Sequence, residues 1–257
     1  YELRLDGKTS KLDSLGSALT IRLPHPAAGL AVNNAFIVIW KIGENGVIVP
    51  VVRGSYDTAG NQAVFTTTHA SGQYAAVYNH PSFEDVSGLN PAKSEIELLA
   101  SRGVIKGMTD TKFMPEKTIT RADFAIMLVR VLELSGTGNI GFDDVLPSDY
   151  YYEDLGVING QADGLFHPHE SISRQDMFVM TLRALKADGD WTPAAVPAAA
   201  ISSFTDYSRI SGYAADDIAA MATAGFIKGD AKQQMNPAAP STRAEAAVLI
   251  YRILMQD

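Results

Sequence analysis

The sequence lacks cysteine, long apolar runs and an excess of positive charge, and each absence excludes a class of protein. Without cysteine there is no disulfide framework. No apolar run approaches the length that spans a membrane. Aspartate and glutamate outnumber lysine and arginine by 29 to 21, which gives a net charge of −8 and disfavours nonspecific binding to nucleic acid or anionic lipid.

The start of the chain also lacks a targeting signal. No charged segment followed by an apolar stretch, the mark of a signal peptide, follows Tyr1. Because the first residue is not methionine, we expect a fragment of a longer polypeptide. The 257 residues, 46% of them hydrophobic, suffice for more than one core, which favours two domains.

One short phrase occurs three times in the chain. It reads ITRADFAIMLVRVL from Ile119, ISRQDMFVMTLRAL from Ile172 and STRAEAAVLIYRIL from Ser241. Such agreement at fixed spacing indicates an internal repeat. Each copy has an arginine (Arg121, Arg174, Arg243), a glycine 14 residues before it (Gly107, Gly160, Gly229) and a proline 6 residues before it (Pro115, Pro168, Pro237).

The repeated phrase predicts the start of a helix. Thr120 and Asp123 have the spacing of a capping box, as do Ser173 with Asp176 and Thr242 with Glu245, although aspartate has a shorter reach than glutamate. The arginine then takes the first helical position, where a cation opposes the helix dipole. Three arginines at this unfavourable position favour a binding task, and the alternative is a salt bridge to a neighbouring carboxylate.

A second arginine follows nine residues after the first in every copy (Arg130, Arg183, Arg252). Nine steps of about 100° turn it to the opposite side of the helix, so the two arginines of one helix cannot serve one site. We interpret the second set as surface or inter-repeat ion pairs. The apolar residues between the two arginines are dense, which predicts that the three helices are buried against one another.

A glycine loop precedes each of these helices. It reads GVIKGMTDTKFMP from Gly103, GVINGQADGLFHP from Gly156 and GFIKGDAKQQMNP from Gly225. The first glycine suits a helix end that needs a positive φ, and the second allows close approach of backbone or ligand. Upstream of each loop, a phenylalanine stands two residues before an aspartate (Phe83 and Asp85, Phe142 and Asp144, Phe204 and Asp206).

These motifs resemble those of the S-layer homology family over about residues 82 to 257. The resemblance implies a mainly α pseudo-threefold trimer of repeats with a central three-helix bundle. It implies grooves between repeats that bind secondary cell-wall polysaccharide with ketal-pyruvate, without catalysis, cofactor or metal. The expected location is extracellular, in the cell wall or S-layer of a Gram-positive-type bacterium. The isolated fragment is expected to be a monomer that has no nucleic-acid or membrane partner and can have surface-layer neighbours.

The resemblance also assigns roles to individual residues. The planar donor pair of a guanidinium matches a carboxylate, so the first arginines are expected to contact pyruvate. The aspartates would line the grooves, and the second glycines would admit the saccharide near the backbone. The expected glycan-binding residues are Arg121, Arg174, Arg243, Asp85, Asp144, Asp206, Gly107, Gly160, Gly229 and Tyr213.

The three copies differ at positions that predict unequal grooves. Copy three has Lys232 and Met235 where the other copies have aspartate and phenylalanine, and copy one has Pro91 where copy three has Tyr213, which can stack on a sugar ring. Copy two is six or seven residues short before Gly156, which leaves no room for a stable first helix. We expect residues to be missing from the sequence near Asp154 and Leu155 rather than a repeat that lacks this helix.

The first eighty residues predict β-structure instead. Short β-branched or aromatic runs such as AFIVIWKI and QAVFTTTH alternate with turn residues, which favours an Ig-like antiparallel sandwich. We interpret it as a spacer or ancillary domain, and the alternative is a second carbohydrate-binding face using Trp40 or Tyr56. The fold class is therefore α+β and multidomain. The expected boundaries are 1–80, 82–135 (repeat 1), 141–187 (repeat 2), 188–203 (an Ala/Pro linker) and 204–257 (repeat 3).

Other functions fit the sequence less well. A glycoside hydrolase would need paired carboxylates, but the adjacent acids Asp143-Asp144 and Asp216-Asp217 point different ways and suit caps or solvated faces. Neither His167-Pro168-His169 nor the acidic loop 143–154 has metal-ligand spacing. The main rival is a self-assembly module whose repeats or β-domain make lattice contacts, with glycan binding secondary.

Overall fold

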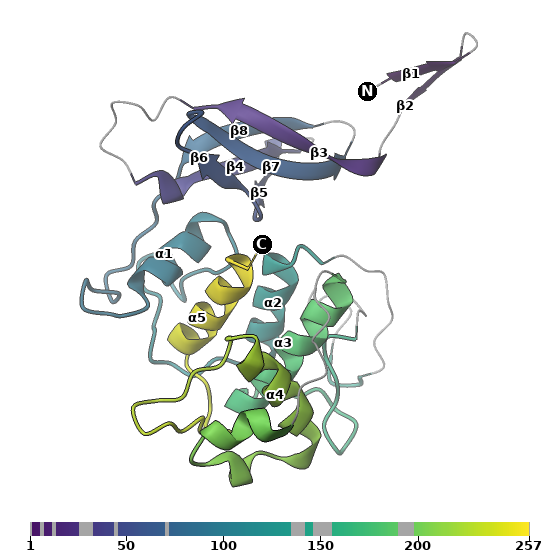
Figure 1. The fold of residues 1–257 in the computed structure, drawn as a ribbon. Helices are drawn as coiled ribbons and strands as arrows, with labels where there is room; N and C mark the ends of the chain where they lie inside the picture. Colours follow the sequence, from purple (N-terminus) through teal and green to yellow (C-terminus); the bar gives the residue numbers. More distant parts are fainter. Residues whose placement is uncertain are drawn as a thin grey trace. The chain divides into compact units, whose positions relative to one another are not determined.

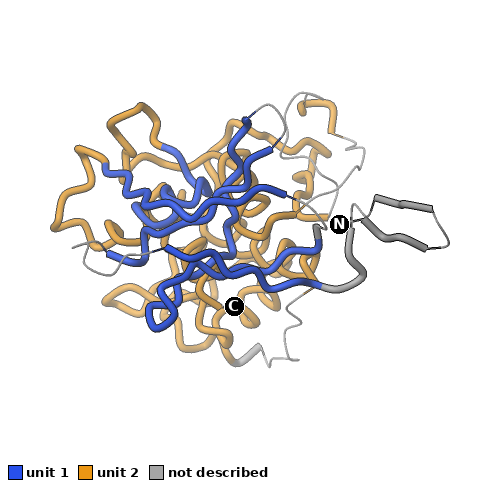
Figure 2. Tube along the Cα trace, turned by 90° about the horizontal axis from the view of Figure 1, so that it is seen from above, with its two compact units in different colours: residues 1–82, 97–106 blue, residues 83–96, 107–257 orange. Residues whose placement is uncertain are grey.

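The computed structural model divides into two compact units, coloured separately in Figure 2. Unit 1 comprises residues 1–82 and 97–106, and unit 2 comprises residues 83–96 and 107–257. Strands dominate unit 1 and helices dominate unit 2, so the chain is α+β as the sequence predicts. The residues described are 2–5, 8–11, 14–25, 33–43, 46–69, 72–134, 142–145, 156–189 and 198–256.

Unit 1 contains two three-stranded antiparallel sheets (Figure 1). A short 3-10 helix, Asn34–Phe36, leads into the second sheet, and a separate hairpin forms β1 (Glu2–Leu5) and β2 (Lys8–Lys11). One sheet has the order β3 (Ser14–Pro24), β7 (Gln62–His69), β6 (Ser55–Asp57), and the other β5 (Ile48–Val51), β4 (Ile37–Ile42), β8 (Gln73–Tyr78).

The two sheets of unit 1 share one hydrophobic core. Ile37 and Ile39 of β4 pack with Ala63 and Phe65 of β7, all of them buried. They alternate along their strands, so one face of each strand is apolar. Tyr74 of β8 adds its ring at a centroid distance of 4.7 Å from that of Phe65. Burial of this apolar area, at about 25 cal/mol per Å², holds the two sheets together.

Unit 1 also includes a segment that lies far along the chain. Helix α1 (Lys93–Ser101) ends within it, and Asn79 Nδ2 donates to the Ser101 carbonyl at 2.7 Å. Nη1 of Arg102 donates to the carbonyls of Val52 and Gly54 at 2.7 and 2.6 Å. The sequence places a boundary near residue 80, and the contacts of this unit extend beyond it because these hydrogen bonds fix residues 97–106 to the strands.

Unit 2 contains the helices that the repeated phrase predicts. These are α2 (Arg121–Val131), α3 (Arg174–Asp188) and α5 (Arg243–Leu254), so each begins at its arginine. The hydroxyls of Thr120, Ser173 and Thr242 accept the backbone N–H of the residue three positions later, as expected of N-caps. The reciprocal bond of a full capping box forms only in the third copy, because only glutamate is long enough to reach back.

The three copies are joined by a ring of backbone hydrogen bonds just before the helices. The N–H of Ile119 donates to the carbonyl of Ser241, that of Ser241 to Ile172, and that of Ile172 to Ile119, each at 3.0 Å. Each copy thus donates to one neighbour and accepts from the other. Helix α2 contacts both α3 and α5.

The helices before the glycine loops are described in two of the three copies. They are α1 in copy one and α4 (Ala215–Thr223) in copy three. Gly103, Gly156 and Gly225 have φ of +70°, +69° and +81°, which confirms their predicted positive φ. Two further 3-10 turns, Tyr207–Arg209 and Gly212–Ala214, lead into α4.

The predicted linker is partly structured. Ala198–Ser203 forms a 3-10 helix that contacts α4, and its Ile201 is buried together with Phe204. These apolar side chains fix part of the stretch that its Ala- and Pro-rich composition predicts to be a linker. The proposed gap at Asp154 and Leu155 and the shortened first helix of copy two lie outside the described residues. Within the described residues, no helix is long and apolar enough to cross a membrane.

Candidate functional site

The aspartates of the three lead segments hold the glycine loops. Asp144 accepts the backbone N–H groups of Phe166 and His167 at 3.0 and 2.7 Å. Asp85 binds Phe113 and Met114 in the same way, at 2.8 and 2.7 Å. In copy three, Asp206 accepts from Met235 and Asn236 at 2.9 and 2.8 Å.

These hydrogen bonds give the aspartates a structural task that the sequence did not reveal. Desolvation raises the pKa of Asp85 and Asp144, but the backbone donors outweigh it and the pKa of both carboxyls lies below its usual value. Each carboxylate oxygen is already engaged by the loop. The aspartates therefore fix the backbone of the loops, whatever further hydrogen bonds a ligand makes with them.

The second glycines close the loops against the lead phenylalanines. A Cβ added to Gly107 would lie 2.8 Å from the Phe83 ring, and one on Gly160 would lie 2.7 Å from that of Phe142. At Gly229 the nearest atom would be backbone, the Cα of Gln233, at 3.0 Å. These glycines are needed because the loop packs tightly on its own copy.

Each first arginine reaches across to the loop of the following copy. Nε–H of Arg121 donates to the carbonyl of Phe166 at 2.8 Å, that of Arg174 to Met235 at 2.7 Å and that of Arg243 to Phe113 at 2.9 Å. The three bonds repeat the cyclic pattern of the backbone ring. The arginines thus lie at the interfaces between copies.

The aromatic residue under the guanidinium differs between interfaces. Cζ of Arg121 lies 4.9 Å from the ring centre of Phe166, and that of Arg243 lies 4.5 Å from Phe113. Met235 replaces the phenylalanine in copy three, so Arg174 stacks instead over Phe178, at a longer 5.9 Å. The cation–π contact is therefore weaker at this interface.

Two of the arginines are deeply buried. Arg121 and Arg243 are 6% and 4% exposed. Burial lowers the pKa of Arg121, opposed by the charges of Asp176 and Glu170. Burial likewise lowers the pKa of Arg243, opposed by Asp123 and Asp85. Arginine stays charged under such shifts, so each interface contains a fixed positive charge.

The interface between copies one and two opens into a cleft of about 420 Å³, called cleft A. Arg121 lies on one side with the loop of copy two. Helix α3 supplies a stripe with the i, i+3, i+4, i+7 spacing of a single helix face. The cleft is lined by Arg121, Asn159, Gly160, Gln161, Ala162, Asp176, Val179, Met180, Arg183 and Tyr213.

Tyr213 is held at the rim of cleft A by hydrogen bonds. Its hydroxyl donates to Oδ1 of Asp176 at 2.6 Å and accepts from Nε2 of Gln175 at 3.0 Å. Desolvation and the bond to Asp176 raise the pKa of Tyr213 to about 12, so it stays neutral. The residue is nevertheless 61% exposed, which leaves ring surface available to a ligand.

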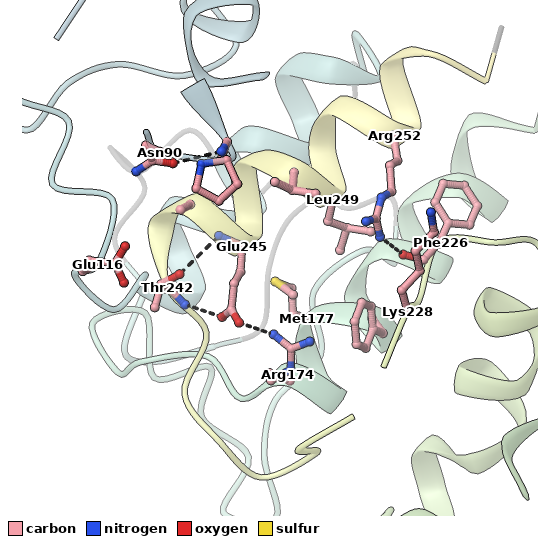
Figure 3. Close-up of a pocket in the computed structure, with 15 residues that line it drawn as sticks. Asn90, Glu116, Arg174, Met177, Phe226, Lys228, Thr242, Glu245, Leu249 and Arg252 are labelled. Carbon is pink, nitrogen blue, oxygen red and sulfur yellow. Dashed lines mark hydrogen bonds and ion pairs between the residues drawn. The ribbon is translucent and has the colours of Figure 1, made fainter. Parts of the chain in front are cut away.

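A second cleft of about 360 Å³, cleft B, lies at the interface of copies two and three (Figure 3). Its lining includes Arg174, Lys228, Glu245, Leu249 and Arg252, with Pro91 from copy one. Nη1 of Arg174 contacts Oε1 of Glu245 at 2.6 Å. Pro91 occupies the place that Tyr213 has in cleft A, as the repeat alignment predicts.

The second arginines line the clefts, which the sequence interpretation missed. Arg183 of α3 lies in cleft A with Arg121 of α2, and Arg252 of α5 lies in cleft B with Arg174 of α3. Two arginines of one helix do point apart, as predicted. Each second arginine lines a cleft together with the first arginine of a neighbouring helix. The fixed nine-residue offset in all copies was the one sequence signal that pointed to a common role.

One residue of the histidine pair and one of the acidic clusters are engaged in ion pairs. Nε2 of His167 lies 2.7 Å from Oδ2 of Asp163, and Asp217 pairs with Lys186 at 3.7 Å. Among the residues that the structure describes, no three His, Asp or Glu side chains gather as a metal site would require. These groups therefore carry no argument for a metal centre or a catalytic carboxylate pair.

The S-layer homology domain profile matches residues 82–125, 141–178 and 203–247. The chain contains three tandem S-layer homology domains. The matched segments coincide with the three copies that the hydrogen-bond ring joins, each containing a lead phenylalanine, a glycine loop and the start of an arginine-bearing helix. The resemblance of the motifs to this family is therefore confirmed.

Several curated proteins share this region. The chain is 35% identical to an amylopullulanase of Thermoanaerobacterium thermosulfurigenes over 79% of its own length and 11% of the relative's. It is 29% identical to the surface-layer 125 kDa protein of Lysinibacillus sphaericus (67% and 14%) and 28% identical to a cellulosome-anchoring protein of Acetivibrio thermocellus (58% and 35%). The chain thus spans about a tenth to a third of these relatives. The domain family and the surface proteins support an extracellular location at the cell wall or S-layer.

Proposed function

We propose that this chain is a non-catalytic module that anchors a protein to the cell surface by binding pyruvylated secondary cell-wall polysaccharide in the clefts between repeats. The observation that carries the proposal is a charged arginine fixed beside an open cleft at two successive interfaces. The anchoring and surface-layer relatives support the anchoring role. The amylopullulanase shares only 11% of its length, which fits a module apart from catalysis.

A pyruvate ketal suits these clefts chemically. Its carboxylate is a planar anion that matches a guanidinium fork, and a charge-assisted hydrogen bond contributes about 1.5 to 3 kcal/mol. The sugar ring supplies an apolar face for Tyr213 and for the aliphatic stripe of Val179 and Met180 in cleft A. A polymer that repeats the epitope can engage more than one cleft, and linked sites raise the overall affinity.

The proposal assigns different tasks to the ten candidate residues. Arg121, Arg174 and Arg243 provide the positive charge at the three interfaces, and Tyr213 provides a stacking surface. Gly160 borders cleft A, where a saccharide can approach the backbone. Asp85, Asp144 and Asp206, with Gly107 and Gly229, act by fixing the loops that shape the clefts.

The finer architecture belongs to the same proposal. We infer that α2, α3 and α5 form the central three-helix bundle of a pseudo-threefold trimer, supported by the ring of backbone hydrogen bonds. The two sheets that share a core favour an Ig-like sandwich for the β-domain. This domain serves as a spacer between the repeats and whatever they anchor.

The test is binding of the chain to purified secondary cell-wall polysaccharide, before and after chemical removal of pyruvate. The proposal expects binding of the intact polymer by the monomer and at least a tenfold loss after pyruvate removal. Equal binding of both polymers would contradict it.

The same samples distinguish this function from the alternative, a module that assembles with copies of itself. The chain should remain monomeric in sedimentation velocity runs without polysaccharide. Concentration-dependent oligomers in the absence of glycan, together with no polymer binding, would favour assembly through surface-layer contacts.

A further inference from the structure

Cleft A contains two guanidinium groups that differ in how far they are already engaged. Arg121 comes from the start of α2 and Arg183 from the third turn of α3, so different repeats contribute them. Both line the same cleft with Val179 and Met180 between them on the α3 stripe. Their availability to a ligand can be judged from their contacts.

Arg121 is largely committed to the protein. Its Nε–H donates to the Phe166 carbonyl at 2.8 Å and its Nη2 to the Asn159 carbonyl at 3.2 Å. Its Nη1 lies 3.9 Å from Oδ2 of Asp176, and its side chain is 7% exposed. Removal of this side chain would take a buried donor from the Phe166 carbonyl, so Arg121 contributes to folding as well as to the charge of the cleft.

Arg183, in contrast to Arg121, is little engaged by the rest of the protein. It is partly exposed, and within the described ranges it makes no hydrogen bond or ion pair. Toward the part of the chain that the structure describes, all five of its N–H donors are therefore unengaged. Its position seven residues after Asp176 puts the two on one face of α3, at opposite ends of the stripe.

The equivalent residue of cleft B does not share this freedom. Nη1 of Arg252 donates to the carbonyl of Phe226 (Figure 3), and the two atoms lie 2.5 Å apart. Burial lowers the pKa of Arg252, opposed by the charge of Glu95. Arg252 thus acts as a fixed contact of copy three, whereas Arg183 is poised for an external anion.

We propose that Arg183 binds the acid group of the saccharide in cleft A. Arg121 instead holds the loop of copy two in place and adds a positive charge to the cleft. This inference rests on the proposed function and refines it. A sugar ring lies on Val179 and Met180 with its carboxylate toward Arg183 and its other face toward Tyr213. The acid-recognising role thus belongs to the second arginine of copy two, beyond the arginine at the helix start.

The experiment is a calorimetric titration of the whole chain with two probes, a short saccharide that carries a ketal-linked pyruvate and the methyl ester of the same compound. The unaltered chain should prefer the acid to the ester. Arg183→Ala should weaken binding of the acid at one class of site about tenfold to a hundredfold, because a charge-assisted hydrogen bond is lost. It should weaken ester binding much less than acid binding, because the ester carries no charge, and it should leave the unfolding temperature unchanged.

The matched control is Lys186→Ala, which removes the same charge from the same helix. Lys186 pairs with Asp217 outside cleft A and is about half exposed. Its loss should change acid binding less than twofold. Arg183→Lys keeps the charge without the planar fork and should lie between Arg183→Ala and the unaltered chain.

The outcomes distinguish the two proposals. If the unaltered chain binds the acid and Arg183→Ala binds it equally well, the assignment of Arg183 is wrong and the proposed function stands. If Lys186→Ala weakens acid binding as much as Arg183→Ala, the effect is general electrostatics and the assignment is again overturned. If the unaltered chain binds neither probe and no wall polysaccharide, the proposed function fails and the inference with it.

Discussion

Clefts A and B are built from equivalent positions of successive repeats, yet they present different surfaces. The acid three positions into the helix is Asp176 in cleft A and Glu245 in cleft B. Asp176 lies 3.9 Å from Nη1 of Arg121, whereas Glu245 lies 2.6 Å from Nη1 of Arg174. The helix-start arginine is therefore in close contact with a carboxylate in cleft B and at a longer distance from one in cleft A. The repeated backbone thus places equivalent residues in both clefts, and the identity of single side chains determines which ligand groups each cleft can bind.

The clefts differ at two further positions. Tyr213 in cleft A is replaced by Pro91 in cleft B, and Asn159 is replaced by Lys228. Cleft A thus offers an aromatic surface, and cleft B offers an additional cation. We expect cleft A to select a pyruvylated sugar by stacking and hydrogen bonding, and cleft B to depend more on charge, with a steeper loss of affinity in salt.

The largest expected effect is a loss of stability when the aspartate that holds the loop of either cleft is removed. Asp144→Ala removes the acceptor for two backbone N–H groups of the loop that borders cleft A, and Asp206→Ala does the same for cleft B. Each should lower the free energy of unfolding by about 2 to 4 kcal/mol in urea titrations, since buried donors lose a charged acceptor. A loss below about 0.5 kcal/mol would show that the loops hold without them.

The second prediction releases the arginine of cleft B. Glu245→Gln keeps a side chain that can close the capping box but removes the charge that pairs with Arg174. Affinity of cleft B for the pyruvylated saccharide should rise about threefold to tenfold in calorimetry. Glu116→Gln is the control, because it removes an equal charge from the same cleft away from this ion pair. Equal gains in both variants would contradict the role of Glu245.

The third prediction tests whether the ring of Tyr213, which cleft B lacks, contributes to saccharide binding in cleft A. Tyr213→Ala should weaken saccharide binding at cleft A about threefold to tenfold, since a stacking contact contributes on the order of 1 kcal/mol. Tyr213→Phe keeps the ring but loses the bond to Asp176, so it should cost less than Tyr213→Ala. Calorimetry of both variants checks the order. If Tyr213→Phe is as weak as Tyr213→Ala, the hydroxyl matters and the ring does not.

The smallest effect concerns pH and the loops of the two clefts. The hydrogen bond to Asp163 raises the pKa of His167, with further support from Glu170 and Asp144. Its contribution to stability is therefore complete below the usual histidine pKa of about 6.5 and is lost as pH rises through the higher folded value. The equivalent Asn236 cannot titrate in this range.

An NMR titration measures this effect directly. The His167 ring should titrate above pH 6.5, and Asp163→Asn should lower that midpoint. A His167→Asn variant should lose the small decrease in unfolding temperature between pH 6 and 8. If the His167 midpoint is not shifted, the predicted difference between the two loops in the pH dependence of their stability is wrong.

The helix starts were predictable because their signals are local. The N-cap residues Thr120, Ser173 and Thr242 lie within three residues of the groups they bind. The positive φ of Gly103, Gly156 and Gly225 follows equally from their place after a helix. The β-structure of unit 1 followed from the period of its apolar runs and from turn residues, although the β1–β2 hairpin was missed.

The tasks of the polar side chains were not predictable, because they depend on partners far along the chain. Asp144 binds backbone groups 22 and 23 residues away, and Arg243 binds the Phe113 carbonyl across 130 residues. A single helix shows that its two arginines point apart, but not which neighbour each one faces. That Arg121 and Arg183 line one cleft becomes clear only once the cyclic order of the repeats is known.

The most direct test is a crystal structure of the chain soaked or grown with a pyruvylated saccharide from the wall polymer. The account predicts the sugar ring in cleft A against Tyr213, with its carboxylate within about 3.2 Å of guanidinium nitrogens that line the cleft. A saccharide bound elsewhere, or one in cleft A whose carboxylate faces solvent, would contradict recognition of the acid by arginines between the repeats.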